Sequence, residues 1–236
     1  MRLLTLRHAE SYSNAHPEAV ALPEEQGDRL TPRGWEQARA AARGLRDLRP
    51  TRLLTSPMRR ARETAEVLAG ELEITPEVDD AIHELREPKE YLELPPEEQK
   101  LRRWSNRMAE RGHDPDHAPP GGESFNAVVG RVRRFKAELE GGDPRAEVVA
   151  VSHGIFLRFF LVDSLLEHRF RAGDAGRLWH LRTVNCGLSV FEHGELRHHA
   201  DPETEGWVCS SWMSQPWAAP GGRFSANPPS TPRSAP

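Results

Sequence analysis

The 236-residue chain has only two cysteines, and it lacks any long apolar run. Cys186 and Cys209 show no metal-ligand spacing and suggest no disulfide framework, so we expect neither a metal site nor disulfides. No charged-then-apolar leader opens the chain, and no segment approaches the roughly 18 apolar residues of a membrane span. These absences predict a soluble, cytoplasmic protein with no membrane partner.

Lysine is also scarce, because only Lys89, Lys100 and Lys136 accompany the many arginines. Where arginine is so frequent, the order and spacing of motifs must carry more weight than any single arginine. The formal net charge of −4 gives no electrostatic case for a nucleic-acid partner. The 37% of hydrophobic residues is enough for a substantial core over most of the chain.

Short apolar runs, typical of buried strands, alternate with stretches of helical spacing. Thr31 and Ser56 are the expected caps of two of the helices. The expected strands are residues 2–6, 52–55, 147–152, 188–192 and 195–199, with one more near Ile74. The expected helices follow residues 31, 56, 124 and 154. This alternation predicts a three-layer α/β sandwich with a mainly parallel sheet and an antiparallel edge pair turning at His193-Gly194.

Two of the expected strands end in a histidine, His8 and His153. Parallel strands point the same way, so both histidines should emerge at the same carboxyl edge of the sheet. Arg7 stands beside His8, and its planar fork suits phosphate oxygens. His153 also opens a helix, whose first amides favour bound anions. Because a neutral imidazole beside a phosphate can attack phosphorus, the pattern predicts phosphoryl chemistry.

Four stretches, in this order, make the interpretation more specific. They are Arg7-His8-Ala9-Glu10-Ser11 with Asn14, residues 30–38 (Leu-Thr-Pro-Arg-Gly-Trp-Glu-Gln-Ala), residues 56–65 (Ser-Pro-Met-Arg-Arg-Ala-Arg-Glu-Thr-Ala), and His153-Gly154 with Asn185. Together they resemble the histidine phosphatase superfamily, also called phosphoglycerate mutase-like. The resemblance covers residues 1 to about 200 and implies the phosphoglycerate mutase-like fold.

The resemblance implies a role for each matching residue. His8 is the nucleophile that becomes phosphohistidine, while Arg7, Arg60 and His153 hold the phosphoryl oxygens and stabilise the transition state. Gly154 is a further phosphate neighbour, and Asn14 and Asn185 are weaker ones, since Asn14 is equally suited to close a turn and Asn185 to cap the loop before a strand. Glu84 is the candidate acid for the leaving alcohol and the later base for water, and Glu87 is the alternative.

The region from residue 79 to 122 is expected to form a lid over the substrate, with Tyr91, Trp104 and Arg102-Arg103 choosing the alcohol portion. Glu123-Ser124, after a glycine pair, resembles a Gly-Glu-Ser segment frequent in the family, and Ser124 is equally suited to cap a helix. Residues 1–200 form the expected phosphatase domain. Residues 201–236, rich in Pro, Ser and Trp, are expected to be a largely disordered tail, with the disorder beginning at about Gly221.

The predicted function is hydrolysis of a phosphomonoester on a small phosphorylated metabolite, without metal or cofactor. The first alternative is a mutase that returns the phosphoryl group to another hydroxyl. Family mutases carry Trp-Asn and Phe-x-Gly-Trp elements soon after the histidine motif, and here Ser13-Asn14 is followed by neither. The second alternative is a catalytically idle module that binds a phosphorylated ligand. A homodimer is a further expectation.

Overall fold

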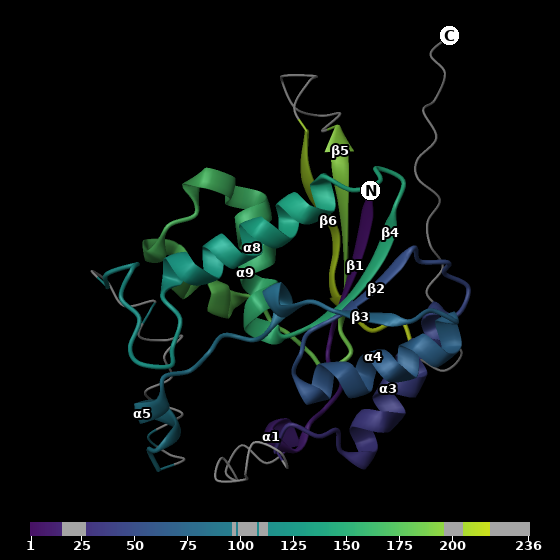
Figure 1. Ribbon diagram of the computed structural model, residues 1–236, viewed down its shortest axis with the longest axis horizontal. Coiled ribbons are helices and arrows are strands. Elements are labelled where there is room, and N and C mark those ends of the chain that lie inside the picture. The colour runs from purple at the N-terminus through teal and green to yellow at the C-terminus, as the bar shows by residue number, and fades with distance from the viewer. Residues whose placement is uncertain (16–26, 96–97, 99–107, 109–112, 196–204, 218–236) are drawn as a thin grey trace.

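The computed structural model describes residues 1–15, 27–95, 98, 108, 113–195 and 205–217, and statements about structure refer to these (Figure 1). Its sheet has the strand order β3-β2-β4-β1-β5-β6. The strands are β1 (Arg2–Arg7), β2 (Arg52–Thr55), β3 (Pro76–Val78), β4 (Glu147–Ser152), β5 (Leu188–Glu195) and β6 (Glu205–Ser214). The first four pair in parallel, whereas β5 and β6 form an antiparallel edge. The predicted α/β fold class is therefore confirmed.

Helices cover both faces of the sheet. The α-helices are α1 (Tyr12–Ala15), α3 (Pro32–Leu45), α4 (Arg59–Leu72), α5 (Lys89–Leu92), α8 (Phe125–Glu140) and α9 (Gly154–Leu166). The 3-10 helices are η1 (Asp80–Ile82), η2 (Glu167–Arg169) and η3 (Ala172–His180). None of the helices in the described ranges is both long and apolar enough for a transmembrane segment.

The alternation of side chains along the strands produces two cores. Val148 and Ala150 of β4 pack in the cluster that includes α8 and α9, whereas Val149 and Val151 pack in the cluster that includes α3 and α4. Figure 1 shows these two helix pairs on opposite sides of the sheet. Because β4 is buried on both faces, it reads as a continuous apolar run, as the sequence predicted.

Two of the three named helix caps form as predicted. The Thr31 hydroxyl accepts a hydrogen bond from the Gly34 amide at 2.9 Å, and the Ser124 hydroxyl accepts one from the Ala127 amide at 3.0 Å. The prediction for Ser56 is wrong, because α4 begins only at Arg59. Ser56 directly follows β2, and its amide donates to the Val151 carbonyl at 3.0 Å. Its hydroxyl accepts the Met58 amide at 3.3 Å and lies 2.7 Å from His153 Nε2.

The C-terminal edge also differs from the sequence prediction. β5 continues straight through His193-Gly194 instead of turning there, and its partner is β6 rather than residues 195–199, of which 196–199 lie outside the described residues. β6 lies in the first part of the expected tail, where the sequence predicted no strand. Trp207 anchors this strand: its ring packs on Phe160, and its indole N–H donates to Glu140 Oε1 at 2.6 Å. Residues 218–236 lie outside the described ranges.

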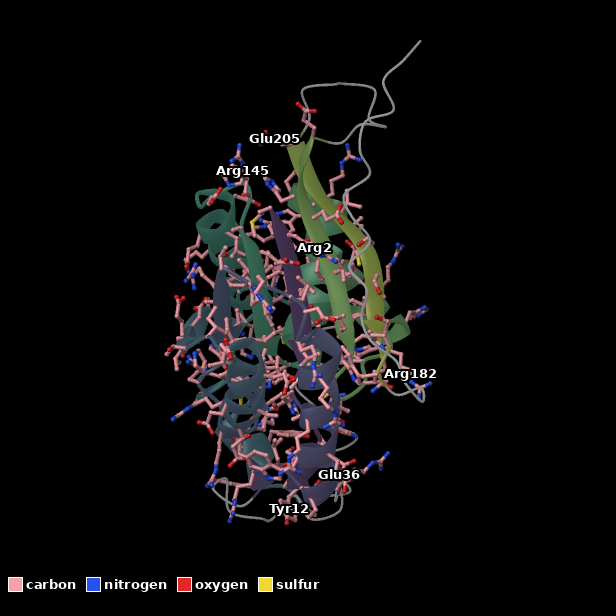
Figure 2. All side chains as sticks on the ribbon, turned by 90° about the vertical axis from the view of Figure 1, so that its right-hand side faces the viewer. Arg2, Tyr12, Glu36, Arg145, Arg182 and Glu205 are labelled. Carbon is pink, nitrogen blue, oxygen red and sulfur yellow. The ribbon has the colours of Figure 1, made fainter. Side chains whose placement is uncertain are left out.

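The parallel strands end at one edge of the molecule. Figure 2 shows Arg145, which precedes β4, near one end, and Tyr12, which follows β1, at the opposite end. β1 and β4 pair in parallel with Arg7 beside Ser152. The residues that follow, His8 and His153, are therefore delivered side by side to the end of the molecule where Tyr12 lies.

Candidate active site

The two strand-end histidines meet in the interior. Their ring centroids lie 5.1 Å apart at an interplanar angle of 52°. Their exposed fractions are 2% for His8 and 0% for His153. The structure thus brings together the two imidazoles that the sequence places 145 positions apart.

Arg60 lies between the histidines and fixes their protonation. Its Nε donates to His8 Nε2 at 3.1 Å, and its Nη2 donates to His153 Nδ1 at 3.1 Å. Since a guanidinium only donates, both ring nitrogens accept. The other ring nitrogens carry the hydrogens: His8 Nδ1 donates to the Ala9 carbonyl at 2.7 Å, and His153 Nε2 donates to the Ser56 hydroxyl at 2.7 Å. His8 therefore presents the lone pair of Nε2.

Both imidazoles are held neutral. Burial, followed by the Arg60 and Arg7 cations, lowers the pKa of His8 well below 6.5. Burial and Arg60 have the same effect on the pKa of His153. At neutral pH the rings are unprotonated beside two fixed cations, and a neutral imidazole is the nucleophilic form.

Arg7 forms the second wall of cations. Its Nη1 donates to the Thr183 carbonyl at 3.3 Å, while its buried Nε has no hydrogen-bond partner in the described part of the chain. Burial lowers the pKa of Arg7, and the nearby Glu84 charge opposes this. A Cβ on Gly154 would lie 2.9 Å from Thr183 Oγ1 and 3.4 Å from Arg7 Nε. Glycine at the start of α9 therefore makes room for the Thr183 side chain, next to the arginine.

Asp28 is a site residue that the sequence reasoning missed. Its carboxylate pairs with Arg60 Nη1 and also accepts the Arg59 amide at 2.7 Å. Asp28 lies in a polar loop without periodicity, 32 positions before Arg60 in the sequence. Nothing local to Asp28 marks it as the partner of a distant arginine, so only the folded chain shows the pair.

Glu84 lies at the start of α9. Its Oε1 accepts the amides of Leu85 at 3.0 Å and Phe156 at 3.1 Å, and its Oε2 accepts the amide of Ile155 at 3.2 Å. The expectation that the first amides of this helix would face a phosphoryl group is wrong for Ile155 and Phe156, because a carboxylate of the protein already binds them. The Glu84 carboxylate is thereby held at the start of the helix that follows His153, within electrostatic range of Arg7.

The motif at residues 30–38 shapes the loop that follows His8. A Cβ on Gly34 would lie 2.1 Å from the Glu10 carbonyl oxygen, so only glycine fits this close approach. Gln37 Oε1 accepts the Glu10 amide at 2.9 Å, and Thr31 Oγ1 donates to Glu10 Oε1 at 2.8 Å. From α4, Thr64 Oγ1 accepts the Ala9 amide at 3.0 Å. These contacts explain why motifs distant in sequence accompany the histidine.

The two asparagines support the backbone of the nucleophile. Asn185 Nδ2 donates to the His8 carbonyl at 3.0 Å and to Asn14 Oδ1 at 3.0 Å. The next residue, Cys186, donates its amide to the Arg7 carbonyl at 3.0 Å. Burial raises the pKa of the Cys186 thiol to about 12, which makes it unreactive.

Comparison with known proteins places this fold and this cluster in a family. The model of the histidine phosphatase superfamily (branch 1) matches residues 3–201. The chain belongs to this superfamily, as the motifs predicted.

Individual relatives include both mutases and phosphatases. The chain is 26% identical to the probable phosphoglycerate mutase GpmB of Erwinia tasmaniensis over 217 residues, which cover 90% of each protein. It is 32% identical over 197 residues to the bifunctional protein Rv2228c of Mycobacterium tuberculosis, covering 81% of this chain and 50% of that one. It thus spans half the length of the latter relative. Among solved structures, the mycobacterial glucosyl-3-phosphoglycerate phosphatase complexed with VO3 superimposes with a TM-score of 0.69 at 25% identity, covering 91% and 99% of the two chains.

Proposed function

We propose that this chain is a phosphomonoester hydrolase that works through a phosphohistidine on His8. The observation that carries the proposal is the buried, neutral His8 ring, whose unprotonated Nε2 lies against the Arg60 guanidinium. A nucleophile with an available lone pair and cations around it are the two requirements of phosphoryl transfer to nitrogen.

In the first step, His8 Nε2 attacks phosphorus and a nitrogen–phosphorus bond forms as the phosphorus–oxygen bond of the ester breaks. Arg60 exchanges its contacts with the rings for contacts with phosphoryl oxygens, and the unpartnered Nε of Arg7 is a second donor for them. The incoming dianion favours a protonated His153, which then donates through Nδ1. Electrostatic stabilisation of this kind is the main contribution in phosphoryl transfer.

The leaving alcohol takes its proton from Glu84. Oε2 of this carboxyl accepts one amide and Oε1 accepts two, so Oε2 is the better placed to carry the transferable proton. After the alcohol departs, the ionised carboxylate takes a proton from a water molecule while the oxygen of that water attacks phosphorus. The nitrogen–phosphorus bond breaks, which regenerates free His8 and releases phosphate. Glu84 is preferred to Glu87 because its carboxylate binds two amides at the start of α9, the helix that follows His153, and lies within electrostatic range of Arg7.

Trapping the covalent intermediate tests the proposal. Wild-type protein, mixed rapidly with 4-nitrophenyl phosphate and quenched in alkali, is expected to gain the mass of one phosphoryl group on the peptide that contains His8. His8→Ala should lose both this label and the turnover. The matched control is His168→Ala, since His168 is exposed on η2. Turnover retained in His8→Ala, or a label on another residue, would contradict the proposal.

The mutase remains the second candidate because of the similarity to the probable phosphoglycerate mutase. Release of inorganic phosphate and isomerisation of 3-phosphoglycerate should be measured on the same preparation. We expect release to dominate, and fast isomerisation with negligible release would identify a mutase. If neither reaction occurs and no phosphohistidine forms, the idle binding module is the correct interpretation.

Vanadate and a metal chelator test whether side chains of the protein alone bind the phosphoryl group. Vanadate is expected to inhibit competitively, by analogy with the relative solved with VO3. A chelator is expected to leave activity unchanged, because protein cations supply the charge that stabilises the phosphoryl group. In the described residues, no group of three or more His, Cys, Asp and Glu side chains is arranged to hold a metal ion. Loss of activity with EDTA, restored by zinc, would contradict this assignment.

A further inference from the structure

A second buried arginine lies behind Glu84. Arg131 on α8 is 3% exposed, and its Nε and Nη2 donate to the two carboxylate oxygens of Glu123 at 3.1 and 2.9 Å. Its Nη1 donates to the carbonyls of Ala81 and His83, both at 2.8 Å. Four of the five N–H donors of the guanidinium are therefore bound within the protein.

Glu123 completes the attachment on the other side of Glu84. Its Oε2 accepts the Arg86 amide at 3.0 Å, and its own amide donates to the Arg86 carbonyl at 3.2 Å. The backbone is thus held at residues 81 and 83 by Arg131 and at residue 86 by Glu123. From β4, Ser152 Oγ donates to the Ile82 carbonyl at 2.7 Å. Glu84 is the carboxylic acid of this clamped segment, and its neighbour there is the buried His83.

We propose that Arg131 and Glu123 are positioning residues for proton transfer, because they fix the backbone of residues 81–86 so that the Glu84 carboxyl stays at the start of α9. The inference rests on the proposed function and extends it to residues without a role in phosphoryl binding. The Gly-Glu-Ser segment thereby acquires a second purpose: Ser124 caps α8, while Glu123 holds the acid segment.

The geometry explains why this pair is arginine and glutamate. Lysine at position 131 lacks the planar fork, so it cannot bind both carboxylate oxygens and two carbonyls at once. Glutamine at position 123 keeps the size of the side chain but loses the charge and one acceptor oxygen. Each change loosens the backbone around Glu84 without altering His8, Arg7 or Arg60.

Two substrates of nearly equal size separate proton transfer from the rest of the reaction. Phenyl phosphate needs a proton on its leaving oxygen more than 4-nitrophenyl phosphate does, because 4-nitrophenolate is stable as an anion. The value of kcat/KM reports the steps through phosphorylation of His8, so the ratio of the two values measures assistance by the acid. Both values are measured on one preparation, so the ratio is independent of the fraction of protein that is folded.

Arg131→Lys and Glu123→Gln are each expected to lower the phenyl-to-nitrophenyl ratio about 10-fold, toward the larger decrease of Glu84→Gln, since general acid catalysis contributes roughly 10²–10⁴-fold. Arg133→Lys is the matched control. It changes an arginine of the same helix that also binds a carboxylate, Asp163 Oδ1 at 2.9 Å, and its ratio should equal that of the wild type. If Arg131→Lys does not fold, Glu123→Gln decides the question.

The outcomes separate this inference from the proposed function. An unchanged ratio in Arg131→Lys and Glu123→Gln, together with a lowered ratio in Glu84→Gln, would show that the pair is only structural. An unchanged ratio in Glu84→Gln itself would overturn the inference while leaving the phosphohistidine on His8 intact. Absence of turnover and of phosphohistidine in the wild type contradicts the proposed function, and the inference then fails with it.

Discussion

Two arginine–carboxylate pairs lie near the histidines, and they differ in what else each arginine binds. Arg60 pairs with Asp28, and the exposed fractions of these side chains are 14% and 12%. Arg131 pairs with Glu123, with exposed fractions of 4% and 11%. Arg60 directs its remaining donors to side chains, including the two imidazoles, whereas Arg131 directs its remaining donors to backbone carbonyls.

This difference distinguishes an arginine that can bind the substrate, Arg60, from one that holds the backbone in place, Arg131. Contacts with side chains can be exchanged for contacts with phosphoryl oxygens when a substrate enters. The positive charge of the arginine then stabilises the negative charge of the phosphoryl group. Contacts with backbone carbonyls fix the course of the chain and have no better partner to move to. Two ion pairs with similar burial can therefore have different roles. The roles follow from the other groups that each arginine binds.

The largest expected effect is on the Arg60 side. Arg60→Ala should lower kcat/KM for 4-nitrophenyl phosphate about 10³-fold, since removal of one well-placed donor already costs about 10²–10³-fold in other active sites. Its free energy of unfolding in urea should fall by less than that of Arg131→Ala, because Arg60 donates to side chains whereas the loss of Arg131 leaves two backbone carbonyls without donors. Steady-state kinetics and urea titration on the same sample test both statements. Near-normal kinetics would remove Arg60 from the mechanism.

The reverse pattern is expected on the Arg131 side. Arg131→Ala leaves the Glu123 carboxylate buried without its cation and two backbone carbonyls without donors. Removing one partner of a buried ion pair costs about 3–5 kcal/mol. The free energy of unfolding should fall by about that amount, measured by urea titration against Arg133→Ala as a control with a more exposed side chain. A loss below about 1 kcal/mol, the value of a surface pair, would show that Arg131 does not stabilise the fold as a buried ion pair does.

The sequence predicted the site around Arg60 better than the Arg131–Glu123 pair that holds the backbone near it. His8, His153 and Arg60 stand where strands end or helices begin, and parallel pairing brings such positions together by a general rule. Gly34 and Gln37, which contact the loop after His8, belong to the motif at residues 30–38 and could be recognised from its spacing in the sequence. The layers of the fold followed from the same alternation of apolar runs.

The contacts that the sequence did not reveal are those between distant polar residues. Asp28 and Arg60 pair across a loop, and Arg131 reaches the carbonyls of residues 81 and 83 from α8, 50 and 48 positions further along the chain. A backbone carbonyl has no signature in the sequence, so an arginine that binds one looks like any other arginine of a helix. The edge strand β6 was missed for a different reason, because its tryptophans Trp207 and Trp212 lie five residues apart, a period that fits neither a strand nor a helix.

A smaller effect is expected from Asp28→Asn. The amide oxygen still accepts from Arg60, so the arginine stays in place but loses the charge that orients it. We expect kcat/KM to fall about 10-fold, in the lower part of the range for partners that orient active-site groups. Glu63→Gln is the matched control, because Glu63 pairs with Arg59, the neighbour of Arg60. An effect of Asp28→Asn as large as that of Arg60→Ala would mean that Asp28 itself takes part in the chemistry.

The smallest expected effect is a shift in the titration of His8. In the wild type, burial and then Arg60 hold the pKa of His8 well below 6.5, so the ring stays neutral as the pH falls through 6.5. The unfolded chain binds that proton near pH 6.5, so this histidine lowers the free energy of unfolding as the pH falls below 6.5, down to its folded pKa. Arg60→Gln removes a nearby cation and should raise the pKa of His8 by roughly one unit.

Titration of the histidine ring signals by NMR measures this shift directly, and thermal unfolding between pH 5 and pH 7 measures its consequence for stability. Arg60→Gln should narrow the interval over which the protein loses stability with acid, because the folded and unfolded pKa values of His8 move closer together. Arg131→Lys should leave the His8 titration unchanged, since burial, Arg60 and Arg7 are the groups that lower this pKa. Equal titration of His8 in wild type and Arg60→Gln would mean that burial alone keeps the nucleophile neutral, and Arg60 would then serve the phosphoryl group rather than the ring.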